Sequence, residues 1–268
     1  MNNYKIFGNE TVDIVIEMGL GACIAEWESL ARELGKNHGV LVYERAGINH
    51  SDKSDRDRTP TNIAKELMNL LDKIPHDEKI VIIGHSQGGL YASEFCGIYP
   101  ETVKGLILLD PLSIEDNRFK NELTAKELKR SGADKSKNFI ILEILARLGL
   151  KGVVKKVMSQ ASPFYYTNFS EEQKEDILNS LVNHTHLYTC REEYRLAHDE
   201  EAILENMEFG RNSRSFAVRI EQLWQEIMKV YLDYSERAIW MQAKKSTHYI
   251  HLTEPELIIE SVNSLCTQ

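Results

Sequence analysis

One stretch, residues 79–100, constrains the fold more than any other, and it reads KIVIIGHSQGGLYASEFCGIYP. It starts as an apolar run typical of a buried strand and continues as a helical segment that Pro100 closes. Between the two, Gly84 and Gly88 flank Ser86. Because glycine has no side chain to clash in a tight turn, this spacing predicts a sharp strand-to-helix turn that exposes the serine.

Short apolar runs alternate with helical periodicity along most of the chain. Such alternation is typical of βαβ units, so we expect an α/β fold with a mostly parallel, doubly wound sheet. Pro60 and Pro255 fall early in two of the expected helices, and Thr253 is the expected N-cap of the last one. The expected strands are 11–18, 39–45, 79–84, 104–111 and 236–244, and the expected helices are 24–34, 59–74, 86–99 and 253–265.

The pattern changes after Pro111, where helices follow one another without strands between them. Residues 139–158 are apolar with helical spacing, and Ser170 with Gln173 predicts a capping box. We therefore expect a core formed by residues 1–111 and 215–268, with residues 112–214 inserted as a helical cap over one end of the sheet.

Composition excludes several classes of protein. The chain has 268 residues, of which 42% are hydrophobic and 27% charged, so it can bury an ordinary globular core. Its formal net charge is −9, and its Lys and Arg residues do not form the clusters that phosphate binding needs. We expect a small-molecule substrate and no nucleic-acid partner, while the oligomeric state stays open.

The four cysteines are widely scattered and lack metal-ligand spacing, so we expect free thiols, a reducing compartment and no metal site. No apolar run approaches 18 residues, and the first residues do not resemble a secretory leader. The sequence therefore predicts a cytoplasmic protein without membrane insertion.

Five segments resemble the α/β-hydrolase fold family of serine hydrolases: EMGLG, YERAGINHSD, GHSQGG, GLILLDP and STHYIHLTEPELI. In that family a nucleophile, an acid and a late histidine follow one another in the chain. The resemblance assigns these roles to Ser86, Asp110 and His248. It implies acyl transfer through a covalent serine ester, with His248 as the base and no cofactor.

The resemblance also implies an oxyanion hole made of two backbone N–H groups. One belongs to Gln87, directly after the nucleophile, and the other to Leu20, in the turn after the first predicted strand. Many members have His-Gly where this chain has Met18-Gly19, so the turn is a variant form. Arg45 is interpreted as a structural residue that holds loops around the site.

The acid has more than one candidate. Many members place it in a loop after a later strand, but no clear strand precedes such an acid here. Asp110 matches the alternative placement of pancreatic-lipase-like members, and its rivals are Glu221 and, further back, Glu205 and Glu208. Asp110 as a structural strand cap also stays open.

The sequence thus predicts a carboxylesterase-like serine hydrolase that cleaves an ester, thioester or amide of a small to medium, partly apolar substrate. The aromatic segment at 163–166 is a candidate pocket lining. A cofactor-free haloperoxidase or C–C hydrolase stays possible on this fold. The alternative of another class is a small-molecule receptor or signalling module with little or no turnover.

Overall fold

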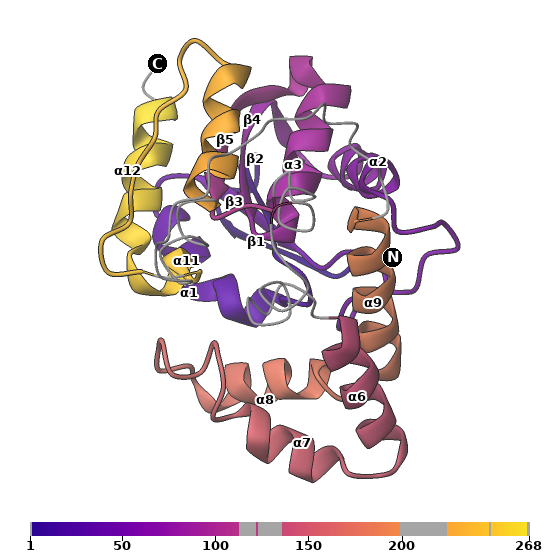
Figure 1. The fold of residues 1–268 in the computed structure, drawn as a ribbon. Helices are drawn as coiled ribbons and strands as arrows, with labels where there is room; N and C mark the ends of the chain where they lie inside the picture. Colours follow the sequence, from indigo (N-terminus) through magenta and orange to yellow (C-terminus); the bar gives the residue numbers. More distant parts are fainter. Residues whose placement is uncertain (1, 113–121, 123–135, 199–223, 247, 267–268) are drawn as a thin grey trace.

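The computed structural model describes residues 2–112, 122, 136–198, 224–246 and 248–266. Its centre is a five-stranded sheet in the order β1-β3-β2-β4-β5, in which β1 is antiparallel to β3 and the other pairs are parallel (Figure 1). The expected mostly parallel sheet is confirmed. The strands are β1 (Tyr4–Gly8), β2 (Val12–Glu17), β3 (Gly39–Tyr43), β4 (His76–His85) and β5 (Val103–Leu109).

Helices cover both faces of this sheet because neighbouring residues of a strand point to opposite sides. Ile16 packs into a core beneath α1 and α12, whereas its neighbour Val15 packs into a second core beneath α2 and α3. The helices of this part are α1 (Ile24–Leu34), α2 (Pro60–Leu71), α3 (Gln87–Ile98), α11 (Ile250–Thr253) and α12 (Pro255–Cys266), with short 3₁₀ turns at Pro100–Thr102 and Val230–Tyr234.

Within residues 136–198, four helices follow one another, and Figure 1 shows them together on one side of the molecule. The predicted capping box is present, because Ser170 and Gln173 exchange hydrogen bonds between side chain and backbone. Gly149, with φ +78°, separates the first two helices. These elements are α6 (Ser136–Arg147), α7 (Lys151–Met158), α8 (Glu171–Ser180) and α9 (His184–His198).

Two sequence-based assignments differ from the structure near the C-terminus. The predicted strand at 236–244 is wrong: the segment is irregular and pairs with no strand among the described residues. Its apolar side chains face outward, with Ile239 76% exposed, so no core selects an extended strand there. Thr253 ends α11 instead of capping α12, and its hydroxyl donates to the Tyr249 carbonyl.

The edge strand β1 was not predicted. It is short and only partly buried, so its sequence lacks the continuous apolar run that marks the central strands. All four cysteines are free, as expected. No helix in the described part of the chain is both long and apolar enough to cross a membrane.

Candidate active site

Ser86 lies between the end of β4 and the start of α3, where the chain turns sharply. Its backbone has φ +53° and ψ −128°, a conformation that L-residues rarely adopt. The neighbouring glycine is required, because a Cβ on Gly88 would lie 2.2 Å from the Glu17 carbonyl oxygen. Ser86 is partly accessible while His85 and Gln87 on either side are buried. The turn thus presents the serine hydroxyl at the edge of the sheet.

Asp110 and His248 come together although 138 positions separate them in the sequence. The Nδ1 atom of His248 lies 2.7 Å from a carboxylate oxygen of Asp110. The other carboxylate oxygen accepts a hydrogen bond of 2.6 Å from Trp224 Nε1. Burial alone would raise the pKa of Asp110, but the hydrogen bond and charge attraction of His248, with the hydrogen bond from Trp224, outweigh it and hold the pKa below its usual value. Asp110 is therefore an anion fixed against the histidine.

Asp110 follows β5 directly, and its backbone has φ +42°. β5 pairs with β4 up to the Leu109 and His85 positions, so Asp110 and Ser86 leave adjacent parallel strands at the same edge. The Ser86 N–H donates to the Leu109 carbonyl at 3.2 Å. The sheet register therefore determines where the acid stands relative to the serine.

His248 is held by its loop as well as by Asp110. Its carbonyl oxygen lies 2.8 Å from Nε2 of His85, the residue before Ser86. Further back in the same loop, the Glu254 carboxylate accepts the backbone N–H groups of Lys244, Lys245 and Ser246. The histidine loop is thus tied both to the serine turn and to the start of α12.

The turn after β2 lies directly against the serine. A Cβ placed on Gly19 would be 3.2 Å from the Ser86 Cβ. The turn is closed by a hydrogen bond of 3.3 Å from the Ala22 N–H to the Gly19 carbonyl, with Gly21 at φ +70°. Leu20 stands inside this turn, and Gln87 is the first residue of α3, where backbone N–H groups lack helical acceptors. Both predicted oxyanion donors therefore belong to segments that border Ser86.

Arg45 explains why this turn holds its shape. Its Nη1 donates to the Met18 carbonyl at 2.6 Å and its Nη2 to the Gly19 carbonyl at 3.1 Å. The guanidinium is buried and also contacts Glu17, on β2, and Glu193, on α9. This geometry agrees with the structural role expected for Arg45.

The aromatic segment at 163–166 reaches the histidine loop through one of its members. The Tyr166 ring lies 5.1 Å from the ring of Tyr249, the residue after His248. Phe164 packs instead with Phe169, Cys23 and Ala25, and Tyr165 is 64% exposed. Tyr166 is therefore the member of this segment whose ring packs against the residue after His248.

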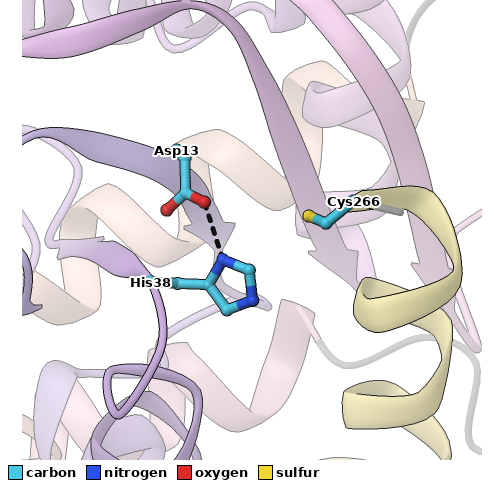
Figure 2. Close-up of side chains that lie close together, drawn as sticks. All are labelled: Asp13, His38 and Cys266. Carbon is cyan, nitrogen blue, oxygen red and sulfur yellow. Dashed lines mark hydrogen bonds and ion pairs between the residues drawn. The ribbon is translucent and has the colours of Figure 1, made fainter. Parts of the chain in front are cut away.

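Two groups of described residues have side chains suited to a metal ion, and neither includes Ser86, Asp110 or His248. One joins Asp13, His38 and Cys266 (Figure 2). It lies at the amino end of β2, about 20 Å along the strand direction from the turn at Gly19. Asp13 already accepts a hydrogen bond from the Gly39 N–H and lies 2.6 Å from His38 Nδ1.

The second group is Cys23, Glu44 and Asp176, in which Glu44 accepts hydrogen bonds from the N–H groups of Ile24 and His50. These bonds account for both groups as structural contacts.

Sequence reasoning missed several residues that hold the site. For Trp224 the sequence offers one usable signal, because an indole N–H that is removed from solvent needs a hydrogen-bond acceptor. The sequence gives no signal for Glu193 or Glu254, because acidic residues are ordinarily solvent-exposed. The rival acids Glu205, Glu208 and Glu221 lie outside the described residues.

Comparisons with known proteins agree with this fold. A sequence model for the α/β hydrolase fold matches residues 14–131, which include the serine turn and Asp110. An α/β hydrolase enzyme from a Medee basin deep-sea metagenome superposes with a TM-score of 0.67 at 18% identity, covering 100% of this chain and 94% of that one. The chain has the α/β-hydrolase fold.

Relatives of this α/β-hydrolase fold protein are similar over different lengths. The uncharacterized protein YqjL of Bacillus subtilis is 26% identical over 94% of this chain and 82% of its own length. The polyneuridine aldehyde esterase of Rauvolfia serpentina is 28% identical, but over 36% of this chain and 38% of its own length. The second match is confined to a part of each protein.

Proposed function

We propose that this protein is a serine hydrolase that cleaves an ester, thioester or amide through an acyl-enzyme intermediate. The observation that carries the proposal is the bond of 2.7 Å between Asp110 and His248 Nδ1, beside a serine at φ +53° in a strand-to-helix turn. The named esterase among the relatives is consistent with this chemistry. The substrate class is a small to medium, partly apolar molecule.

In the proposed reaction, the Asp110 carboxylate accepts a hydrogen bond from the Nδ1–H group of His248, so the proton stays on Nδ1 and Nε2 is free to act as the base. Nε2 takes the proton of the Ser86 hydroxyl as the oxygen attacks the substrate carbonyl. The same imidazole then gives that proton to the leaving group. Water attacks the resulting serine ester and gives a proton to Nε2, and the imidazolium returns that proton to the Ser86 oxygen as the acid product leaves.

The developing oxyanion would be stabilised by the backbone N–H groups of Gln87 and Leu20. Gln87 lies at the N-terminus of α3, whose dipole also favours negative charge. We further propose that residues 112–214, which include α6–α9, form a cap that shapes the substrate pocket, while residues 1–111 and 215–268 form the catalytic core. Tyr166 of this proposed cap packs against Tyr249 in the histidine loop.

A fluorophosphonate probe tests the proposal directly, because it reacts with an activated serine. We expect one adduct by intact-protein mass spectrometry, absent from Ser86→Ala, together with turnover of a short-chain p-nitrophenyl ester. Ser93, whose hydroxyl donates to the Gly89 carbonyl within α3, provides a matched control as Ser93→Ala. No adduct, or an equal adduct on Ser86→Ala, would reject the proposal, and labelling without turnover would favour the receptor alternative.

A further inference from the structure

A buried charged cluster joins helix α9 to the turn beside Ser86. At its centre is Arg45, which is 2% exposed. One edge of its guanidinium faces Glu193 of α9: Nε lies 3.1 and 3.2 Å from the two carboxylate oxygens, and Nη2 lies 2.9 Å from one of them. The end of the same guanidinium faces the Met18 and Gly19 carbonyls. One planar group therefore connects the inserted helices with the backbone of the turn.

The contact with the Gly19 carbonyl determines how the next peptide N–H points. The C=O and N–H of a trans peptide lie on opposite sides of the chain, so fixing the Gly19 oxygen on Arg45 directs the Leu20 N–H away from Arg45. Gly19 itself lies against Ser86. The orientation of the predicted oxyanion donor thus depends on the guanidinium of Arg45, together with the Ala22 N–H that donates to the same carbonyl.

Glu193 is the stronger of the two anionic partners of Arg45. Burial would raise the pKa of Glu193, but Arg45 and Arg58 outweigh it and hold the pKa below its usual value. Glu17, the other partner, has its pKa raised to about 7 by burial despite Arg45. At neutral pH the Glu17 carboxyl is therefore only partly ionised, while Glu193 stays a full anion and is completely buried.

We propose that Glu193 is a positioning residue for the oxyanion hole. It holds the guanidinium of Arg45 in the orientation that fixes the Gly19 carbonyl, and so aims the Leu20 N–H at the substrate oxygen. This inference rests on the proposed serine hydrolase function. It makes the docking of α9 a condition for an assembled oxyanion hole, although α9 itself supplies no group to the reacting atoms.

A purely structural ion pair would behave differently. Removing one partner of a buried pair destabilises the protein whatever the pair does for catalysis. Positioning of an oxyanion donor, in contrast, affects the tetrahedral state more than the bound substrate, so it lowers kcat and weakens tetrahedral inhibitors while KM changes little. Affinity for an aryl boronic acid, which forms a tetrahedral adduct with the serine, reports on this difference.

The test compares Glu193→Gln with Glu143→Gln. Glu143 is a matched control because it is a buried carboxylate on α6 that pairs with Arg147 and Arg191 without contacting Arg45. For Glu193→Gln we expect kcat on p-nitrophenyl butyrate and boronic acid affinity to fall together by about 10- to 100-fold, with KM little changed. Both quantities should stay near wild type in Glu143→Gln.

The inference is overturned if folded Glu193→Gln keeps wild-type kcat and boronic acid affinity, or if it loses kcat without losing that affinity. Should Glu193→Gln fail to fold, Glu193→Asp retains the charge on a shorter side chain and is expected to show the same paired loss. Fluorophosphonate labelling of wild-type Ser86 separates the two levels of proposal. If the probe labels wild-type Ser86 and the wild-type protein hydrolyses the ester, an unaffected Glu193 variant refutes the inference alone. If the wild-type protein is neither labelled nor active, the proposed function is refuted and the inference with it.

Discussion

Nε2 of His85 lies 2.8 Å from the carbonyl oxygen of His248, so the residue before the serine supports the residue proposed as its base. A carbonyl oxygen can only accept, which means that His85 carries its proton on Nε2. The His85 ring is buried and lies 4.7 Å from the His248 ring and 5.5 Å from Trp27. The side chain therefore combines a hydrogen bond to the loop with aromatic packing.

We expect His85→Phe to preserve the packing and lose the hydrogen bond. The protein should fold with about 1 kcal/mol less stability, the usual net contribution of one such bond. Because the His248 loop is then less well fixed, kcat on a p-nitrophenyl ester should fall by about tenfold. Steady-state kinetics with thermal melts measure both effects, and unchanged kcat in His85→Phe would show that the bond does not position the base.

Asp110 provides a second prediction. Replacing the carboxylate with an amide, as Asp110→Asn, removes the anion that accepts from His248 Nδ1 and should lower kcat by about 10⁴-fold while the fold persists. Glu221→Gln is the comparison for the rival acid, and it should retain activity. Near-native turnover in folded Asp110→Asn, with loss in Glu221→Gln, would transfer the role to the glutamate.

Trp224 allows the same site to be examined from its other side. Its Nε1 donates to the carboxylate oxygen of Asp110 that His248 does not use. Trp224→Phe keeps most of the ring and loses this donor, so we expect a smaller decrease in kcat than Asp110→Asn causes. A loss as large as that of Asp110→Asn would mean that the indole does more than support the acid.

The sequence was informative where structure depends on local periodicity. The strand before Ser86, the helix after it and the capping box at Ser170 all follow from residue spacing, and the structure contains each of them. The apolar residues at 236–244 wrongly predicted a strand, because these side chains are exposed and the segment has no described strand to pair with. Periodicity reports which face is apolar, but it does not report what that face packs against.

The supports of the site could not be predicted because they are long-range contacts. Arg45 meets Glu193 across 148 positions and Asp110 meets Trp224 across 114. Nothing local distinguishes a glutamate that will be completely buried from one on a solvated helix face. Ser86 and Asp110, in contrast, stand next to strand ends, and the resemblance to a known family locates His248 in the loop before the last helices.

Glu254 gives a prediction about the histidine loop. Its carboxylate accepts three backbone N–H groups from residues 244–246, and these bonds lower its pKa to about 2. A carboxylate whose pKa is lower in the folded state stabilises the fold above its ordinary pKa, and this contribution disappears as pH falls towards about 2. Glu254→Gln should therefore be less stable than wild type at pH 7, with the difference shrinking in acid.

The exposed Glu256, in the first turn of α12, supplies the matched control as Glu256→Gln. Thermal melts from pH 7 to pH 3 should show a pH-dependent difference for Glu254→Gln and a much smaller one for Glu256→Gln. Equal behaviour of the two variants would mean that the carboxylate of Glu254 does not hold the loop.

His251 yields the last prediction. Its ring stacks on Trp27 at 3.8 Å with an interplanar angle of 5°, and neither ring nitrogen has a hydrogen-bond partner among the described residues. Burial, with the nearby His85 and His248, holds the pKa of His251 well below its usual value. The folded protein therefore keeps this imidazole neutral at a pH where the unfolded chain protonates it. Protonation then favours unfolding, so stability falls as pH drops below about 6.5.

The variant His251→Phe retains the stacking surface and cannot bind a proton. At pH 7 its melting temperature should equal or exceed that of wild type, since an apolar ring of similar shape replaces buried polar atoms without partners. Between pH 6 and pH 5 wild type should lose about 1 kcal/mol more stability than the variant. The reason is that wild type binds a proton at His251 when it unfolds, and the variant does not. His186, whose pKa is lowered to about 4 by burial, remains in both proteins and accounts for part of the shared acid sensitivity. Urea denaturation at the two pH values measures the difference, and parallel loss in both proteins would show that His251 is already protonated, or hydrogen-bonded, in the folded state.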